Sequence, residues 1–394
     1  MPSSEVDQST KPLAGLRVLD LTRVLAGPWA TQTLADLGAD VIKVERAGNG
    51  DDSRSFGPPF LNPADCGIDG ASAMFLAANR GKRSVGLDLA SPTGGDEFRR
   101  LVADADILIE NFKVGTMARM GFAPDQLREI NPRLIVCSIT GYGQTGPYSA
   151  RGGYDPVIQG LCGLMSVTGK PTGEPGGGPV KTGPSLVDLI TGLYATIALL
   201  AAVRERDSTG KGCDIDMSLL DCGVAMVAQQ MMYYQLTGTP PGPIGNNANG
   251  GVPGGGYDCV DGQIIIAPGN DAGYARMCRA LGHPELANDP RFVANSSRLA
   301  HKRELLALFE PIIAQWTVAE LSEVLTAHDV PNGPVNDLSQ VVADPQVDSR
   351  GLLTELEGVS GFYQIAGPIV INGRRMTSDV PPPALDNHAS TNWN

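Results

Sequence analysis

Short apolar runs alternate with amphipathic segments along the first half of the chain. The apolar runs predict buried strands, and they fall at 16–21, 41–45, 84–89, 107–112, 134–143 and 213–219. The amphipathic segments between the first five predict helices, at 28–38, 94–105 and 124–130. Strands that alternate with helices are typical of a mostly parallel sheet covered on both faces. The predicted fold class is therefore α/β.

Two turn-rich stretches interrupt this alternation. The stretch 141–184 is rich in glycine and proline, and GTPPGPIGNNANGGVPGGG follows at 238–256. After the second stretch, a hairpin about Asp261 and Gly262 precedes several helical segments, which indicates a smaller α+β domain. We expect a large domain over 1–224, a small domain over 225–330, and a C-terminal segment over 331–394 that returns to the large domain.

Length and composition limit the classes of protein. A chain of 394 residues exceeds what one core usually serves, which agrees with two domains. The net charge of −13 argues against nucleic acid as a partner, because phosphate binding needs clustered Lys and Arg. The first residues lack the apolar stretch of a signal peptide, and the apolar run 193–203 is too short to cross a bilayer. The seven Cys lack metal spacing, so we expect a cytoplasmic protein without structural zinc or a membrane partner.

An acidic residue, Asp188, lies near the start of the apolar segment TGPSLVDLITGLYATIALLAAV at 182–203. Ser185 and Asp188 match a capping box, in which Asp188 only satisfies free amides at a helix start. The same position supports a second interpretation. A helix N-terminus favours an ionised carboxylate, and a carboxylate beside a glycine-rich loop can serve as a nucleophile. The spacing alone leaves both interpretations open.

Basic residues gather near the strand ends. Arg46, Arg54 and Arg119 follow predicted strands, whereas Lys82 and Arg83 lie just before one. Residues that follow parallel strands lie at the carboxyl edge of the sheet, where phosphate-bearing ligands bind in such folds. The alternative is ordinary surface charge.

Three other sequence patterns concern a dinucleotide site, a nucleophile–histidine site and a glycine-rich segment. The first strand–helix turn, TRVLAGPWA, lacks the G-x-G-x-x-G of a nicotinamide dehydrogenase. The four His have no neighbouring nucleophile, and G-x-S-x-G is absent. The run GNNANGGVPGGG at 245–256 is either a linker or a lid that approaches a ligand through backbone.

Several segments together resemble the class III CoA-transferases, whose superfamily also contains the methylacyl-CoA racemases. The resemblance runs from about Pro12 to Pro382 and rests on the number and order of its motifs. These are LAGLRVLDLTRVLAGPWATQTLADLGADVIKVERAGNGDDSR, NRGKRSVGLDL, ENFKVGTMARMGF, SITGYGQTGPYSARGGYDPVIQG, TGKGCDIDMSLLD and DPRFVANSSRLAHKREL.

This resemblance implies a mechanism and a site. Asp188 matches the catalytic aspartate, which forms an acyl-aspartyl anhydride and then an aspartyl-CoA thioester. No metal, ATP or tightly bound cofactor is needed, and coenzyme A enters as a substrate. Tyr154 and Asp155 match an active-site pair, and Gly254, Gly255 and Gly256 match a mobile glycine loop. The implied contacts to CoA are Val24, Leu25, Ala26, Arg46, Arg54, Lys82, Arg83, Asn111, Phe112 and Arg119.

The resemblance also implies a Rossmann-like large domain, an interlocked homodimer and a substrate class. The chain is similar to succinyl-CoA:dicarboxylate transferases of the glutarate type, so we expect succinyl-CoA as donor and a short dicarboxylic acid as acceptor. Leu25 replaces the Gln of formyl-CoA transferase, and Arg151 is a candidate partner for a remote carboxylate. The alternatives are a racemase, which has His where this chain has Tyr154, or a non-catalytic CoA-binding protein.

Overall fold

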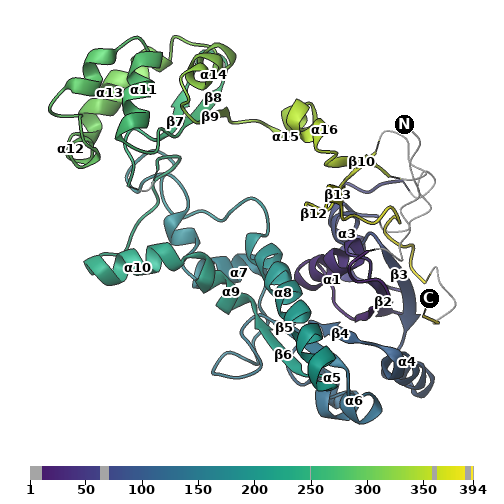
Figure 1. The fold of residues 1–394 in the computed structure, drawn as a ribbon. Helices are drawn as coiled ribbons and strands as arrows, with labels where there is room; N and C mark the ends of the chain where they lie inside the picture. Colours follow the sequence, from purple (N-terminus) through teal and green to yellow (C-terminus); the bar gives the residue numbers. More distant parts are fainter. Residues whose placement is uncertain (1–10, 63–70, 249, 357–361, 387–391, 394) are drawn as a thin grey trace. The chain divides into compact units, whose positions relative to one another are not determined.

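The computed structural model describes residues 11–62, 71–248, 250–356, 362–386 and 392–393, which form two compact units (Figure 1). Unit 1 holds the described residues up to Met165, together with Lys181–Thr239 and the residues from Pro345 onward. Unit 2 holds Ser166–Val180 and Pro240–Asp344. The domain limits expected from the sequence, after 224 and after 330, remain predictions.

The centre of unit 1 is a six-stranded parallel sheet, as the sequence predicts. Its strands are β1 (Arg17–Asp20), β2 (Asp40–Arg46), β3 (Lys82–Leu87), β4 (Ile107–Glu110), β5 (Ile135–Thr140) and β6 (Asp214–Ser218). Their order is β3-β2-β1-β4-β5-β6, and every neighbouring pair is parallel. This is the Rossmann order, in which the direction of strand addition reverses between β1 and β4.

Helices cover the two faces of this sheet. One face carries α4 (Pro92–Asp104), α5 (Thr116–Arg119) and α6 (Pro124–Ile130), whose apolar side chains share a core with alternate residues of the strands. The helices α1 (Ala26–Asp36) and α8 (Leu186–Thr209) pack against each other and contact the strands. Unit 1 also contains η2 (Asp52–Ser55), α3 (Ala73–Ala78), α7 (Asp155–Leu161), α9 (Leu219–Met226) and α10 (Ala228–Thr237), and a short turn, η3 (Met165–Val167), follows α7.

Helix α8 approaches α1 closely because of a glycine. A Cβ at Gly192 would lie 2.6 Å from the Ala26 carbonyl oxygen, so no larger residue fits there without displacement. The helix has 24 residues, and its most apolar window has a mean hydropathy of 2.1 and is 39% buried. A helix of this length and hydropathy is long enough to cross a membrane. The prediction from 193–203 that the apolar segment is too short to do so is therefore wrong. A core helix of a soluble protein passes the same test.

Unit 2 is built on a three-stranded antiparallel sheet. Its strands are β7 (Gly255–Asp258), β8 (Gln263–Ile266) and β9 (Asn332–Pro334), and β7 and β8 form the hairpin predicted about Asp261 and Gly262. Its helices are α11 (Asp271–Ala280), η4 (Pro284–Asn288), α12 (Asn295–Ala300), α13 (Lys302–Ile313), α14 (Val318–Ala327) and α15 (Leu338–Val342). His301 separates α12 from α13, and a single apolar core joins sheet and helices.

The C-terminal segment lies along the outer edge of β3. It contains α16 (Pro345–Ser349), β10 (Leu353–Glu355), β11 (Tyr363–Ile365), β12 (Val370–Ile371) and β13 (Arg374–Arg375). The Gly81 amide donates to the Val380 carbonyl, and the Gly86 amide donates to the Asp386 carboxylate. These bonds cover part of an edge strand that would otherwise expose unpaired backbone groups.

Candidate active site

Two pockets adjoin at the carboxyl edge of the sheet in unit 1. The first, of about 180 Å³, is lined by residues that follow β1, β2 and β3, including segment 87–90. The second, of about 190 Å³, is lined by residues 23–26 and 111–114, by part of the segment 149–154 and by Asp188. Arg23 and Phe112 line both pockets. They follow β1 and β4, between which the strand order reverses, and ligands bind at such points in open α/β sheets.

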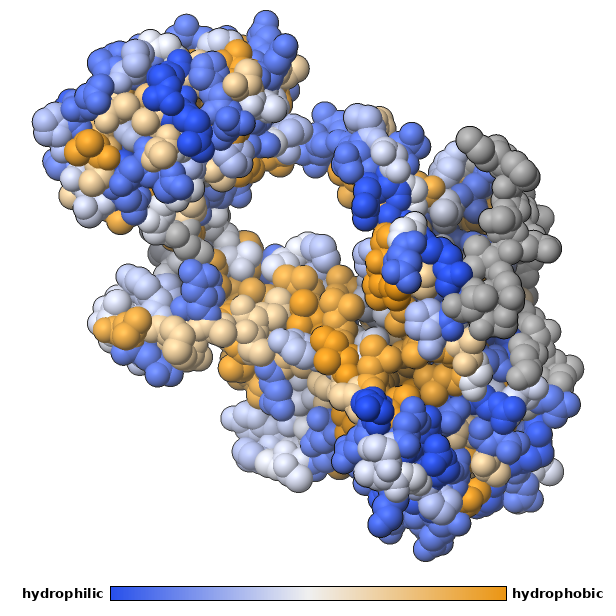
Figure 2. Space-filling view, in the orientation of Figure 1, coloured by the Kyte–Doolittle hydropathy of each residue, from blue (hydrophilic) through white to orange (hydrophobic). Residues whose placement is uncertain are grey.

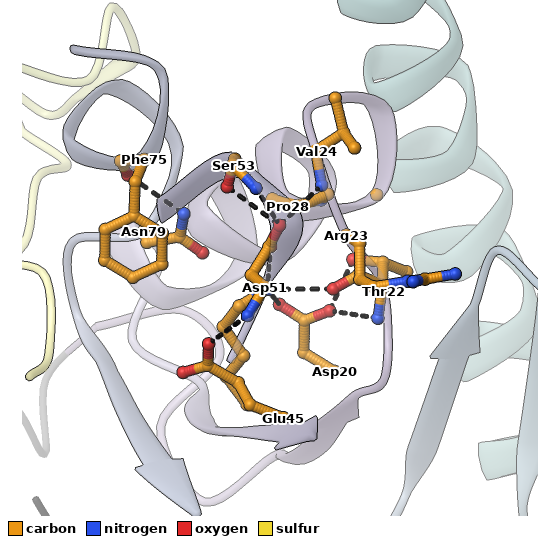
Figure 3. Close-up of polar contacts among 12 residues, drawn as sticks. Asp20, Thr22, Arg23, Val24, Pro28, Glu45, Asp51, Ser53, Phe75 and Asn79 are labelled. Atoms are coloured by element: carbon orange, nitrogen blue, oxygen red, sulfur yellow. Dashed lines mark hydrogen bonds and ion pairs between the residues drawn. The ribbon is translucent and has the colours of Figure 1, made fainter. Parts of the chain in front are cut away.

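The turn between β1 and α1 forms one wall of the second pocket, and its backbone is fixed by side chains. Asn111 accepts from the Arg23 amide at 3.0 Å and donates to the Arg23 carbonyl at 2.8 Å. The Val24 amide donates to Asp51 at 3.1 Å (Figure 3). Val24 has φ 71°, which is unusual for a β-branched residue. Such strain persists only where surrounding contacts impose it, and it is common at ligand sites.

A buried charged network supports this turn from below (Figure 3). The Lys43 ammonium is 2.9 Å from the Asp51 carboxylate and donates to the Thr22 carbonyl. The Lys82 ammonium is 2.9 Å from the Asp20 carboxylate, and these four charged side chains have no solvent exposure. Burial lowers the pKa of Lys82 to about 8, although Asp20 opposes the shift. The network pairs its buried charges, which fits a structural role beneath the turn.

Asp188 lies in the first turn of α8, where the cap differs from the predicted one. Ser185 occupies the N-cap position but makes no side-chain cap hydrogen bond, so the predicted capping box is wrong. Asp155, from the first turn of α7, accepts instead from the amides of Val187 at 2.9 Å and Asp188 at 3.2 Å. Its other oxygen accepts from Gln159 at 2.6 Å. Because Asp155 caps the helix, the Asp188 carboxylate remains available to the pocket that it lines.

The pKa of Asp188 is raised to about 7. Burial of the carboxylate is the main cause, and the negative charge of Asp155 is the second. From the sequence we expected the helix N-terminus to favour the ionised form, but two of its amides donate to Asp155. Asp188 therefore changes charge near neutral pH, and as a basic carboxylate it suits nucleophilic attack.

Most of the residues assigned from the sequence come together at this edge. The second pocket is lined by Val24, Leu25, Ala26, Asn111, Phe112, Tyr154 and Asp188. Arg46 lines the first pocket, and Tyr154 is 67% exposed. Arg119 is exposed and donates to Thr116, which lines the first pocket. Gly254, Gly255 and Gly256 belong to unit 2.

Three basic residues that the resemblance gives as CoA contacts have their side chains in ion pairs and hydrogen bonds within the protein, which argues against CoA contacts for them. Lys82 donates to Asp20, Asn79 and the Pro28 carbonyl, so its three protons are used. Arg54 is buried, and its guanidinium is bonded to Glu45. Arg83 lies near the start of β3, at the amino edge of the sheet, where it pairs with Asp40. The rule that places basic residues at the carboxyl edge does not apply to a residue at the start of a strand.

Sequence reasoning missed several residues of the site. Arg23 lines both pockets, and Leu87 and Asp88 line the first. Arg23 follows a predicted strand, so the rule used for Arg46 could have found it. Asp51 holds the Val24 amide from across the turn, and no local pattern signals that contact. Among the residues described, no group of three or more His, Cys, Asp or Glu is arranged to hold a metal ion.

Comparison with known proteins decides the family. The model of CoA-transferase family III matches residues 13–389. The chain belongs to CoA-transferase family III. It is 44% identical to the succinate–glutarate CoA-transferase of Agrobacterium fabrum, over 96% of this chain and 94% of that protein. It is 40% identical to the succinyl-CoA:glutarate CoA-transferase of Mus musculus, over 98% of this chain and 86% of that protein.

Solved structures agree with this assignment to family III. A CaiB/BaiF family protein from Brucella suis is 44% identical, with a TM-score of 0.85 over 96% of this chain and 97% of that chain. A protein from Mycobacterium tuberculosis is 33% identical, with a TM-score of 0.83 over 96% and 98% of the two chains. The chain is thus a family III CoA-transferase with an α/β fold, and CoA thioesters are its substrates.

Proposed function

We propose that this CoA-transferase moves CoA from succinyl-CoA to a short dicarboxylic acid, with Asp188 as the nucleophile. The observation that carries the proposal is the position of Asp188. Its carboxylate lines a pocket at the carboxyl edge of the sheet, beside Tyr154 and the turn 24–26, and its pKa is raised to about 7. Relatives that are 44% and 40% identical over nearly the whole chain are named succinate–glutarate and succinyl-CoA:glutarate CoA-transferases, which supports this choice of donor and acceptor.

The reaction is a sequence of acyl transfers that conserves the thioester. The Asp188 carboxylate attacks the succinyl-CoA carbonyl, which forms a mixed anhydride and releases CoA thiolate. The thiolate attacks the Asp188 carbonyl, which forms an aspartyl-CoA thioester and releases succinate. The acceptor carboxylate then attacks this thioester, and the released thiolate attacks the acceptor acyl carbon. The new acyl-CoA leaves, and the Asp188 carboxylate is restored.

Water must not reach these activated intermediates, because hydrolysis would destroy the thioester energy. We assign to Gly254, Gly255 and Gly256 a role in closing the site and in offering backbone amides to the oxyanions. The support is the resemblance of this segment to the glycine loop of the family. The amides of Leu25 and Ala26, at the start of α1, are further donor candidates because they border the Asp188 pocket.

The two adjoining pockets suit the two ends of CoA. The first is mainly apolar, and Leu87, Leu89 and Phe112 line it, so we place the adenine there. Arg23, Lys113 and Arg151 line the second pocket, which Asp188 also lines, and they suit the phosphates. Arg23 pairs with Asp52, whereas neither Lys113 nor Arg151 has an acidic partner within the described part of the chain.

Arg151 has a second interpretation, as the partner of the remote substrate carboxylate. It stacks at 3.9 Å over Tyr148 and lines the same pocket as Asp188. Arg151→Ala separates the two roles. If Arg151 binds phosphate, KM rises equally for succinyl-CoA and for acetyl-CoA, which has no remote carboxylate. If Arg151 binds the remote carboxylate, KM rises for succinyl-CoA alone.

We also infer a homodimer, because unit 1 exposes a broad apolar surface. Leu193, Tyr194, Ile197 and Leu200 form an exposed stripe on α8, and Ile197 is 60% exposed. Figure 2 shows hydrophobic residues gathered where α8 crosses the face in view. Helix α10 has no buried residue. Exposed apolar patches of this kind mark protein interfaces.

A CoA exchange assay tests the proposed activity. Purified protein is mixed with succinyl-CoA and, in separate samples, glutarate, itaconate, mesaconate, malate, oxalate and carnitine, and acyl-CoA products are identified by mass spectrometry. We expect glutaryl-CoA, or another dicarboxylyl-CoA, to appear without ATP. A product from oxalate or carnitine alone would contradict the acceptor class. A racemase is not favoured, because Tyr154 stands at the expected His position and the described lining of the pocket contains no His.

A further inference from the structure

The turn that borders Asp188 depends on one buried carboxylate, Asp51, which directly precedes η2. One of its oxygens accepts from the Val24 amide at 3.1 Å and from the amide and hydroxyl of Ser53 at 2.8 Å (Figure 3). Its other oxygen lies 2.9 Å from the Lys43 ammonium. Burial alone would raise the pKa of Asp51, but Lys43 and these hydrogen bonds lower it below its usual value. Asp51 is therefore an ionised acceptor beneath the turn.

The position of the Val24 amide determines how the chain enters α1. Val24 has φ 71°, which a β-branched residue adopts only where surrounding contacts impose it. Leu25 and Ala26 follow directly, and their amides donate to no acceptor within the described part of the chain. These three residues line the same pocket as Asp188. The hydrogen bond to Asp51 thus sets the orientation of two unpaired amides that border this pocket.

Asp51 is itself held in place by an ion pair at the end of β2. The Asp51 amide donates to one oxygen of Glu45 at 2.8 Å, and Arg54 Nε donates to the same oxygen at 2.8 Å. The other oxygen accepts from Arg54 Nη2 at 2.7 Å and from the Ser84 hydroxyl at 2.6 Å. A Cβ at Gly50 would lie 2.8 Å from Arg54 Cδ. Glycine therefore allows the chain before Asp51 to pack directly on this ion pair.

We propose that Asp51 and Arg54 are positioning residues that set the turn 23–26 for CoA transfer. Arg54 orients the Glu45 carboxylate, which holds the Asp51 amide. The Asp51 carboxylate in turn holds the Val24 amide. All of these contacts lie within unit 1. Because Asp51 is 2% exposed and Arg54 is 5% exposed, they act on the substrate through the backbone that they hold.

The proposal rests on the proposed function, in which Asp188 is the nucleophile and the Leu25 and Ala26 amides are donor candidates for the oxyanions. A displaced turn removes these donors from the transition state more than from the bound substrate. Loss of one oxyanion donor typically lowers kcat about 10²–10³-fold, and a partial displacement costs less. We therefore expect kcat to fall about ten- to hundredfold, while KM for succinyl-CoA changes less than about threefold.

Arg54→Met is compared with Arg80→Met, because the two arginines have matched surroundings. Each is 5% exposed, bonds one buried carboxylate through Nε and Nη2, and donates to a carbonyl of the C-terminal segment. Arg80 pairs with Asp36, at the far end of α1 from the turn. Both variants leave a buried carboxylate without its partner, so both should lose stability. Only Arg54→Met should lower kcat in the way described.

Two substitutions of Asp51 separate the hydrogen bond from the charge. Asp51→Asn keeps an oxygen that can accept from the Val24 amide, whereas Asp51→Ala does not. We expect kcat to fall less in Asp51→Asn than in Asp51→Ala. In a Val24→Gly background, where a positive φ is not strained, Asp51→Ala should lower kcat by a smaller factor than in the wild type.

A second measurement follows the turn itself. Amide hydrogen exchange is measured on each full-length protein in peptides that cover 21–29. We expect exchange about tenfold faster in Arg54→Met and Asp51→Ala, and unchanged exchange in Arg80→Met, because only the first two release the Val24 amide. The arginine pair decides the question if Asp51→Ala does not fold.

The same samples are examined for the covalent CoA adduct on Asp188, so that two kinds of failure are distinguished. An adduct in the wild type, with kcat and exchange equal in Arg54→Met and Arg80→Met, would overturn the positioning role and leave the proposed function intact. An equal fall in kcat for Asp51→Ala with and without Val24→Gly would do the same. A wild type that forms no adduct on Asp188 would instead overturn the proposed function.

Discussion

At the scale of single residues, Asp155 and Asp188 share one helix end, and the amides there donate to Asp155. Asp155 is 4% exposed and fully engaged, whereas Asp188 lines the pocket. The two carboxylates therefore have different roles. Asp155 caps α8, whereas the Asp188 carboxylate is largely buried and lies near the negative charge of Asp155. The raised pKa of Asp188 follows from that division.

The ionisation of Asp188 sets a pH dependence for activity and stability. Its carboxyl pKa rises from 3.8 to about 7 on folding, so the folded state binds more protons across that interval. Stability from this group therefore falls as pH rises from 4 to 7, and kcat/KM rises as pH passes 7. Asp188→Asn is expected to abolish turnover, retain CoA binding and raise the unfolding free energy at pH 8 by about 2 kcal/mol.

The measurements are kcat/KM against pH for the wild type, and thermal unfolding of both proteins at pH 4.5 and pH 8. The gain from Asp188→Asn should shrink at the lower pH, where the wild-type carboxyl is already protonated. Equal gains at both values, or turnover by Asp188→Asn, would contradict this account.

The negative charge of Asp155 is the second cause of the raised Asp188 pKa, so its removal should shift the dependence of kcat/KM on pH. Asp155→Asn keeps a carbonyl oxygen that can accept from the α8 amides but removes the negative charge. We expect the acidic limb of kcat/KM to move to lower pH, because Asp188 ionises more easily. Asp216→Asn, which changes an acid that accepts from the Gln144 amide, is the control. An unmoved limb in Asp155→Asn would show that Asp155 acts only as a cap.

At the scale of elements, the turn between β1 and α1 stores strain beside the site. Val24 has φ 71°, a conformation that costs about 1–2 kcal/mol in an L-residue other than glycine. Val24→Gly should therefore leave the unfolding free energy unchanged or raise it. Val114→Gly, in the same pocket but without a positive φ, should lower it. The free energies of unfolding of the two variants are measured in urea. An equal loss of stability in both would contradict a left-handed conformation at Val24.

The elements themselves were largely predictable from sequence, because several strands of the parallel sheet carry short apolar runs, such as ILIE in β4 and IVC in β5. The hairpin about Asp261 was equally accessible, because a turn signal lies between two apolar runs. The capping of α8 was not, since its acceptor comes from α7, 33 residues before Asp188. The burial of the Lys82 side chain was also not predictable, because the sequence at a strand start does not show whether a basic side chain there is buried or exposed.

At the scale of the whole molecule, the exposed stripe on α8 makes assembly testable. We expect the purified protein to have twice the chain mass of 41.3 kDa in multi-angle light scattering. Ile197→Asp places a charge in the stripe and should shift the protein to the monomer mass or to aggregates. Arg204→Glu, at an exposed position of the same helix, should leave the mass unchanged. A monomeric wild type, or a dimer that tolerates Ile197→Asp, would contradict this interface.

The central claim is that Asp188 carries the acyl group and CoA in turn, and an isotope measurement tests it directly. In the proposed sequence, one carboxylate oxygen of the acceptor remains on Asp188 when the new acyl-CoA leaves. Enzyme is incubated with succinyl-CoA and ¹⁸O-labelled glutarate, digested, and sequenced by mass spectrometry. The account predicts ¹⁸O in the Asp188 carboxyl and none in Asp155. Glutaryl-CoA formed with no label in Asp188, or with label in another residue, would contradict it.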